Sequence, residues 1–256
     1  MPPAETRREE LKAVWKQAQA CTKCPQLAAT RTTVVFGAGN ADADLMFVGE
    51  APGAREDESG LPFVGQAGRL LDQLLEEIGL ARSDVFIANT LLCRPPGNRD
   101  PLPGEIDNCR HWLYRKLELI EPRVICTLGN FSTKLLRADP GTGITRLHGR
   151  EEIRRIGPRT VRLYPLYHPA AALYTPSMLE TLRADFSRIP DLLALPAPTQ
   201  PASHPADLVG GHRPAGTGQQ PAPQQPAAAE LVVPEPEVAA DDTEAPEPES
   251  AQLGLF

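Results

Sequence analysis

The sequence lacks any long apolar segment. No run of apolar residues approaches the roughly 18 that a membrane-spanning helix needs. The first residues, MPPAETRREE, also lack the apolar core of a secretory signal peptide. These two absences argue against a membrane or secreted protein, so we expect a cytosolic one.

Aromatic and basic side chains are nearly missing from the last quarter of the chain. Residues 191–256 contain no aromatic residue before Phe256, 12 of the 28 prolines, and one basic residue against ten acidic ones, a net charge of −9. Residues 1–190 carry 25 basic and 23 acidic residues, so their +2 and the −9 give the −7 of the whole chain. Such a tail cannot bury enough apolar surface to offset the entropy lost on ordering. We therefore expect a nearly neutral folded domain at 1–190, with room for a basic face, and a disordered acidic tail at 191–256.

Cysteine is also scarce, with five residues in the chain. In a reducing cytosol, cysteines are more often metal ligands or buried thiols than a disulfide framework. Four of them follow the spacing C-x2-C, then 68 residues, then C-x15-C, namely Cys21, Cys24, Cys93 and Cys109. Zinc and an iron–sulfur cluster both accept four thiolates and leave no open coordination position, so we expect a structural metal, with plain buried thiols as the alternative. Cys126, in the strand-like run VICTL, is predicted to be a core residue.

Strand-like and helix-like patterns alternate along the chain. The predicted strands are residues 34–36, 45–48, 85–88, 124–128 and 161–166. The predicted helices are residues 5–20, 67–78, 104–120, 131–136 and 177–189. Alternation of this kind predicts an α/β fold in which helices cover both faces of a parallel sheet.

Residues 49–65, GEAPGAREDESGLPFVG, follow the apolar run LMFV and so begin at the carboxyl end of a predicted strand, where open α/β sheets bind ligands. A glycine-rich turn at this place usually binds phosphate. This turn, however, carries the carboxylates Glu50, Glu56, Asp57 and Glu58, and carboxylates repel phosphate. The ligand is therefore predicted to be something other than a nucleotide phosphate.

Two further loops follow predicted strands and should reach the same edge of the sheet. They are residues 89–101, NTLLCRPPGNRDP, and residues 166–174, LYHPAAALY. Together with the first loop they bring carboxylates, Asn89, His168 and the aromatic ring of Phe63 to one crevice. Pro169 fixes the turn after His168 and favours a rigidly aimed imidazole, although a histidine after a strand is more often a packed or surface residue.

Four motifs occur in the order GEAPGxxED, PFVGxAGxLL, N-x-x-x-CRPPGNRDP and HPAAxL, together with the four-cysteine spacing. This combination resembles that of family 4 uracil-DNA glycosylases, the bacterial and archaeal iron–sulfur enzymes. The resemblance covers about residues 5–190. It implies a three-layer α/β/α sandwich around a central, mainly parallel four-stranded sheet. It also implies excision of uracil from DNA and a [4Fe-4S] cluster, with zinc as the alternative, on Cys21, Cys24, Cys93 and Cys109.

The resemblance implies roles for the crevice residues once deoxyuridine is flipped out of the DNA. Phe63 would stack on the uracil ring. The amide of Asn89 would match N3–H and O4 of uracil, a pattern that cytosine reverses. His168 would donate a hydrogen bond to O2 as negative charge develops there, which is typically worth roughly 3 kcal/mol.

The first loop departs from related glycosylase families at Ala51, where those families carry an aspartate that positions the attacking water. Glu50 is therefore our first candidate for that task, with the loop's backbone carbonyls as the alternative. Ala51 and Gly53 are assigned to the pocket, and Glu56 to the exclusion of thymine's methyl group. A carboxylate here also favours the cationic sugar of a dissociative transition state. Asp57 and Glu58 belong either to this site or to a solvated loop face.

DNA contacts are expected from other loops. The candidates for phosphate contacts, with ordinary surface charge as the alternative, are Arg94, Asn98, Arg99, Arg146 and Arg150. Leu173 is a candidate wedge for the gap left by the flipped base, with core packing as the alternative.

The last residues, QLGLF, resemble the Q-L-x-L-F peptide with which bacterial repair and replication proteins bind the sliding clamp. The candidate anchors are Gln252, Leu253, Leu255 and Phe256, on what would be a flexible tether, and an incidental terminus is the alternative. We expect a monomer that associates with the nucleoid through DNA.

No lysine occurs in the site motifs to form a Schiff base, so a monofunctional glycosylase is expected rather than a lyase. The competing hypothesis is a non-catalytic or covalently trapping uracil-DNA binder. One related trapping group carries a basic insertion with a histidine in the second motif, whereas CRPPGNRDPLPGE has no such insertion. A zinc-stabilised DNA-binding protein is the third hypothesis.

Overall fold

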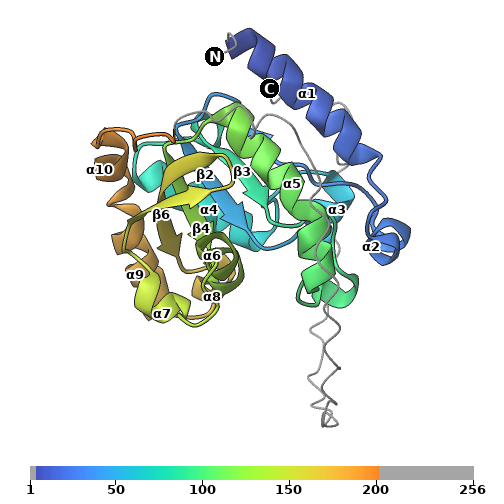
Figure 1. Ribbon diagram of the computed structural model, residues 1–256. Coiled ribbons are helices and arrows are strands. Elements are labelled where there is room, and N and C mark those ends of the chain that lie inside the picture. The colour runs from blue at the N-terminus through green and yellow to red at the C-terminus, as the bar shows by residue number, and fades with distance from the viewer. Residues whose placement is uncertain (1–3, 202–256) are drawn as a thin grey trace. The chain divides into compact units, whose positions relative to one another are not determined.

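The computed structural model describes residues 4–201 as an alternating series of helices and strands (Figure 1). In chain order these are α1 (Ala4–Gln19), α2 (Pro25–Thr30), β1 (Ala38–Gly39), β2 (Leu45–Gly49), α3 (Ala54–Ser59), α4 (Gln66–Glu77), the 3-10 turn η1 (Arg82–Asp84), β3 (Phe86–Asn89), the 3-10 turn η2 (Pro96–Asn98), α5 (Pro103–Ile120), β4 (Val124–Leu128), α6 (Asn130–Arg137), α7 (Ile144–Leu147), β5 (Glu152–Ile156), β6 (Arg159–Leu166), α8 (Pro169–Ala172), α9 (Pro176–Phe186) and α10 (Ile189–Ala194).

The sheet has the strand order β1-β3-β2-β4-β6-β5. Its four central strands, β3, β2, β4 and β6, are parallel, which confirms the predicted parallel sheet. Two antiparallel edge strands extend it, β1 beside β3 and β5 beside β6, so the described residues form six strands rather than four. The sequence missed β5 because its side chains alternate between exposed and partly buried, as expected of an edge.

Helices cover both faces of this sheet, as the sequence predicts. Alternate residues of β2 belong to different core clusters: Met46 and Val48 pack with residues of α1 and α5, whereas Leu45 and Phe47 pack with residues of α4 and α9. Burial on both faces explains why the strand is uniformly apolar. The structure therefore has the three layers of an α/β/α sandwich, and Cys126 lies fully buried in it, as predicted.

Two predicted elements differ from the structure. Residues 34–36 are buried but form no strand, and Gly37, with a φ of 132°, separates them from β1. The last predicted helix, residues 177–189, is divided into α9 and α10. Pro190 lies in the first turn of α10, where a missing N–H is tolerated.

Helix α10 continues to Ala194 and buries Leu192, a few residues past the expected domain boundary at 190. The clamp-like peptide, with Gln252, Leu253, Leu255 and Phe256, lies outside the described residues. Within residues 4–201, no helix is both long enough and apolar enough to cross a membrane.

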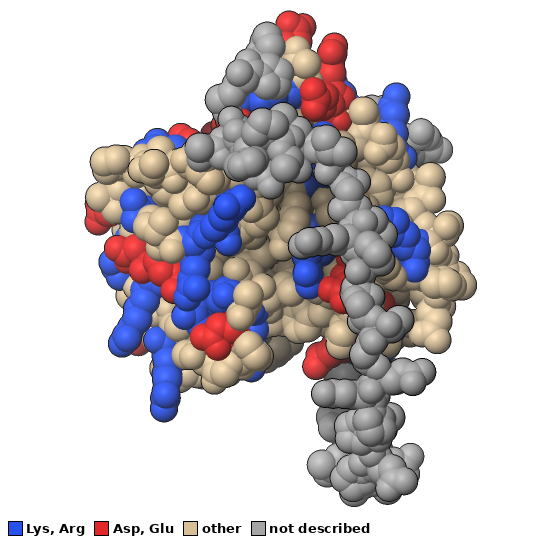
Figure 2. All heavy atoms as spheres, viewed as in Figure 1, with Lys and Arg blue, Asp and Glu red and all other residues tan. Residues whose placement is uncertain are grey.

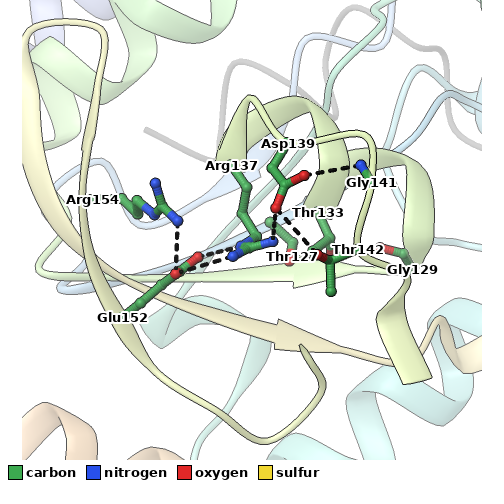
Figure 3. A network of polar contacts seen from close by, with 9 residues as sticks. All are labelled: Thr127, Gly129, Thr133, Arg137, Asp139, Gly141, Thr142, Glu152 and Arg154. Atoms are coloured by element: carbon green, nitrogen blue, oxygen red, sulfur yellow. Dashed lines mark hydrogen bonds and ion pairs between the residues drawn. The ribbon is translucent and has the colours of Figure 1, made fainter. Parts of the chain in front are cut away.

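A polar network fixes α6 against β4 and β5 (Figure 3). The hydroxyl of Thr133 donates to the carbonyl of Gly129 at 2.7 Å, one turn earlier. Farther along the helix, Arg137 lies 2.5 Å from a Glu152 carboxylate oxygen and 2.9 Å from one of Asp139. Gly129, which accepts the Thr133 hydroxyl, lies beside His168, since a Cβ on this glycine would lie 3.1 Å from the histidine Cβ. The network thus supports one wall of the site described next.

Candidate active site

An open cavity of about 550 Å³ lies where the carboxyl ends of β2, β3 and β6 meet the loops that follow them. It collects residues from all three predicted loops: Glu50, Ala51, Gly53, Glu56, Phe63, Asn89, Asn98, Arg99, His168 and Leu173. The convergence of these loops therefore follows from the parallel strand order, as expected. Among the expected site residues, Arg94, Arg146 and Arg150 do not line this cavity.

Asn89, the last residue of β3, places a buried amide at the cavity wall. The residue is 2 % exposed, and its Oδ1 has no hydrogen-bond partner among the described residues. A buried acceptor without a partner is costly, so the site is poised to accept a hydrogen bond from a ligand. Position 49 has to be a glycine, because a Cβ there would lie 2.4 Å from the Asn89 Oδ1 and 2.8 Å from the Phe63 ring.

Phe63 presents its ring to the cavity from an unusual backbone conformation. Its φ is 54°, which is uncommon for a residue with a side chain and costs on the order of 1 kcal/mol or more. Arg82 holds this conformation by donating to the Phe63 carbonyl at 3.0 Å and to the Pro62 carbonyl, while an ion pair of 2.8 Å ties it to Asp72. Gly68 of α4 allows the close approach, since a Cβ would lie 1.8 Å from the Phe63 carbonyl oxygen.

His168 caps the N-terminus of α8 with its imidazole. The Nδ1 atom accepts the N–H of Ala170 at 3.1 Å, so the proton of the neutral ring lies on Nε2. Burial lowers the pKa of His168 to about 4, against the opposing effect of the Glu56 carboxylate. The ring lies 5.6 Å from that of Phe63, at an angle of 28°. His168 is therefore a neutral hydrogen-bond donor at neutral pH.

Glu50 follows β2 and is held by its backbone. Its carbonyl accepts the N–H of Leu91 at 3.0 Å and the hydroxyl of Thr90. Burial raises the pKa of the Glu50 carboxyl, and the nearby charge of Asp100 raises it further. Glu50 and His168 also line a neighbouring groove between α5 and α6, which contains Lys134. The Glu50 side chain thus lies where the cavity and the groove meet.

Glu56 fastens the two ends of the first loop to each other. One carboxylate oxygen accepts the N–H groups of Val64 and Gly65, at 2.9 and 3.0 Å. The other accepts the N–H of Gly53 at 3.1 Å. Glu56 does line the cavity, but both of its oxygens are bound to backbone, so the structure gives it a role in shaping the pocket.

The next two acidic residues, Asp57 and Glu58, differ in their exposure to solvent. Asp57 is 3 % exposed and accepts backbone N–H groups of Thr32 and Thr33 at 3.0 to 3.3 Å. A solvated loop face is therefore the wrong interpretation of Asp57. Glu58 is exposed, so that interpretation holds for Glu58. An acidic run read from sequence alone does not separate the two.

The predicted phosphate-contacting arginines are partly bound within the protein. Arg99 forms two hydrogen bonds to Glu105, at 3.0 and 2.6 Å, and its guanidinium holds the pKa of that carboxyl below its usual range. Arg94 donates to Asn98 at 2.8 Å. Arg146 and Arg150 are exposed outside the cavity. Figure 2 shows many Lys and Arg side chains over the region of β5, β6 and α7.

Two apolar side chains stand at the cavity rim after α8. Leu173 is 36 % exposed and Tyr174 is 82 % exposed, and both line the cavity. Core packing is therefore not the explanation of Leu173. Sequence reasoning missed Tyr174, although an aromatic residue directly after the candidate wedge was a usable signal.

The four cysteines meet at a separate, smaller cavity. Cys21, Cys24, Cys93 and Cys109 all line it, and its free volume is about 20 Å³. It is bounded by the ends of α1 and α2, the segment after β3, and α5. Among residues 4–201, no three or more metal-binding side chains converge into a closed coordination group. The structure thus shows a shared cavity with four thiols at its wall.

Hydrogen-bond donors point at the sulfur atoms of this cavity. Arg31 donates to the Cys93 sulfur at 3.2 Å, and the Asn108 amide to the Cys24 sulfur at 3.6 Å. Burial raises the pKa of the Cys109 thiol to about 12, although the backbone N–H of Leu92 opposes this. Donors of this kind stabilise thiolates that bind a metal, so the donor set fits a sulfur-ligated metal group.

Comparison with known proteins identifies the family. The profile of the Uracil DNA glycosylase superfamily matches residues 36–191. A type-4 uracil-DNA glycosylase of Archaeoglobus fulgidus is 45 % identical over 195 residues, covering 75 % of this chain and 97 % of that protein. Proteins of the same name from Sulfurisphaera tokodaii and Thermotoga maritima are each 43 % identical, covering 73 % and 66 % of this chain and 87 % and 85 % of theirs. The chain belongs to the uracil-DNA glycosylase superfamily, which confirms the resemblance found in the sequence.

Proposed function

We propose that this protein is a monofunctional uracil-DNA glycosylase, which hydrolyses the N-glycosidic bond of a flipped deoxyuridine and leaves an abasic site. Family membership and the names of the relatives support this activity. The structural observation that carries it is the buried, unpartnered Oδ1 of Asn89 beside the rings of Phe63 and His168.

Asn89 and Phe63 account for base recognition. Uracil carries a donor at N3 and an acceptor at O4, which an amide oxygen and an amide N–H match in turn. Cytosine presents an acceptor at N3 and a donor at N4, so it would leave both amide atoms unpaired in a buried site. Phe63 supplies the flat surface on which the ring stacks.

His168 stabilises the leaving uracil. As the bond between C1′ and N1 breaks, the electron pair stays on uracil and the negative charge spreads to O2. A neutral imidazole that donates its Nε2–H to O2 lowers this barrier, typically by roughly 3 kcal/mol per donor. No proton has to be transferred in this step, which agrees with the low pKa of His168.

Glu50 is assigned to the water and to the sugar. The side chain of Ala51 is a methyl group and cannot orient a water molecule, whereas the ionised carboxylate of Glu50 accepts a hydrogen bond from water and stabilises a cationic sugar. Water then attacks C1′ and gives up its proton to the carboxylate or to solvent. Backbone carbonyls of the same loop remain the alternative acceptors.

DNA binding is assigned to the rim of the cavity and to the adjoining loop that carries Arg94. Leu173 would fill the space left by the flipped nucleotide, and its exposure supports this role. Arg94 and Arg99 would contact phosphates. For Arg99 the ion pair with Glu105 leaves less of the guanidinium available. We expect the protein to act as a monomer on DNA of the nucleoid.

We assign a [4Fe-4S] cluster to Cys21, Cys24, Cys93 and Cys109. Four thiolates suit such a cluster, and a single zinc ion is the alternative. Bound there, it would supply a structural link, joining the N-terminal helices to the segment between Asn89 and α5. A brown protein with about four irons per chain would support the assignment, and zinc without iron would exclude it.

One assay separates the glycosylase from its rivals. The purified protein is incubated with an excess of uracil-containing oligonucleotide, and the DNA is then treated with alkali. Strand cleavage over many turnovers supports the glycosylase. A stable protein–DNA adduct would instead indicate a covalent trap, and binding without either product a non-catalytic binder.

Binding of the sliding clamp through Gln252, Leu253, Leu255 and Phe256 stands as a separate proposal, supported by the QLGLF sequence alone. Deletion of residues 252–256 should abolish co-elution with the clamp while excision from short oligonucleotides stays intact. Unchanged co-elution would exclude the proposal.

A further inference from the structure

The neighbouring carboxylates Glu56 and Asp57 hold different parts of the chain. Glu56 binds N–H groups of Gly53, Val64 and Gly65, in the loop that carries Phe63. Asp57 binds N–H groups in the segment of residues 32–33, which precedes the sheet. The short helix α3 therefore joins the base pocket to another region of the fold.

That other region is the wall of the four-cysteine cavity. Arg31, directly before the segment that Asp57 binds, donates to the Cys93 sulfur at 3.2 Å. Val35 on the other side of the segment donates its N–H to the Leu92 carbonyl at 2.8 Å. The residues bound by Asp57 are thus fixed at both ends to the strand exit that carries Cys93.

The burial of Asp57 makes these contacts energetically important. The side chain is 3 % exposed, and the described hydrogen bonds to it come from backbone N–H groups. A buried carboxylate is stable only when its oxygens are satisfied, and N–H groups left without an acceptor are equally costly. Separating residues 32–33 from α3 would therefore cost substantial free energy, so the two are expected to move together.

We propose that Asp57 is a positioning residue for uracil excision, coupling the four-cysteine region to the base pocket through α3 and Glu56. The inference rests on the proposed glycosylase activity and on the cysteine site. Changes at the Arg31–Cys93 contact shift the segment at residues 32–33, and Asp57 transmits that shift to the loop that presents Phe63.

The substitution Asp57→Asn tests the coupling with little change in shape, because it replaces one acceptor oxygen with an NH2 group that faces an N–H donor. We expect kcat/KM on uracil-DNA to fall about tenfold or more. We also expect the inhibition constant of free uracil to rise by a similar factor, while affinity for abasic-site DNA and the iron content stay unchanged. A merely structural loss would not separate uracil binding from DNA binding in this way.

Glu58→Gln is the matched control, since it removes a neighbouring carboxylate that is exposed. It should leave every one of these values unchanged. An active wild-type protein in which Asp57→Asn behaves like Glu58→Gln would overturn the inference. An inactive wild-type protein would instead overturn the proposed glycosylase function, so the two failures are distinguishable.

Hydrogen exchange of the wild-type protein gives a second test that requires no variant to fold. Saturating free uracil should slow amide exchange at residues 61–66, beside the ligand, and also at residues 31–35. Protection confined to 61–66 would contradict coupling. In addition, Arg31→Gln and Asp57→Asn should change the uracil inhibition constant less in combination than the sum of their separate effects, because both interrupt the same connection. Additive effects would also contradict it.

Discussion

The base pocket and the cysteine cavity differ in the hydrogen bonds that reach their key atoms. In the pocket, Asn89 has an unpartnered buried oxygen and His168 has a pKa lowered to about 4 by burial. In the cavity, Arg31 and Asn108 donate to the sulfurs of two cysteines. A buried acceptor without a partner is open to a ligand, whereas donors around thiols suit sulfurs that bind a metal. Burial also raises the pKa of the Cys93 and Cys109 thiols, so a shifted pKa alone does not distinguish the two sites.

Removing a cysteine should have the largest effect, because it affects both regions. On the proposed cluster assignment, Cys24→Ser should release iron, lower the melting temperature by roughly 10 °C, and abolish most excision. Activity is lost because Cys93 lies shortly after Asn89 on the same segment. Iron analysis, thermal melting and the alkali assay measure the three effects.

Cys126→Ala is the control for this prediction. Cys126 is fully buried in the core and lies outside the cysteine cavity. The variant should keep its iron and its activity even if it melts at a lower temperature. Loss of iron from this variant as well would mean that iron retention reports core packing rather than ligation.

Removing the hydrogen-bond donor of the pocket, the imidazole of His168, should lower chiefly the rate of bond cleavage. His168→Ala should lower kcat roughly 100- to 1,000-fold, as for other donors to a developing anion. The iron content should remain that of the wild type, and the melting temperature should fall by a few degrees at most, because the ring caps only its own turn through Ala170. Single-turnover rates with uracil-DNA measure the effect, and a loss of tenfold or less would assign O2 stabilisation to another group.

The pH dependence of excision should report Glu50. The carboxylate is required in its ionised form, so the rate should rise with pH through a pKa above the ordinary value of glutamate, since burial and Asp100 raise it. His168 remains neutral above a pH of about 4, so its titration does not change the excision rate in the neutral pH range. Glu50→Gln should lower the rate about tenfold to 100-fold and remove this acidic limb. A limb that persists in the variant would point to another group.

The sequence predicts the convergence of the pocket well, because strand order determines it. Asn89 ends a parallel strand, and His168 follows another, so their meeting requires only the sheet topology. The hydrogen bonds to the main chain that hold the pocket residues in place cannot be recognised from the sequence. Asp57 lies in the run EDES, which resembles a solvated surface, yet it is buried by a segment far from it in sequence.

Arg82 is the clearest residue that sequence reasoning missed. Its partners are the backbone carbonyls of Pro62 and Phe63. Because every residue type has a backbone carbonyl, the sequence gives no sign of this contact. Only the positive φ of Phe63, a property of the folded chain, shows why this contact is needed.

Replacing Arg82 should have a smaller effect than the changes above, and it is specific to the pocket. Arg82→Gln removes the fork that holds the Phe63 backbone, so the ring should sample other positions, and kcat/KM should fall about fivefold to tenfold. Uracil inhibition should weaken by a similar factor, because stacking is affected before chemistry.

Arg183→Gln is the matched control, since Arg183 forms an exposed ion pair with Glu77, at 3.0 Å, on the helices α9 and α4. Exposed pairs of this kind contribute little to stability, and this one lies outside the cavity. If both variants lose activity equally, the effect of Arg82 arises from general loosening of the fold. A loss confined to Arg82→Gln would show that the strained conformation of Phe63 is itself part of uracil recognition.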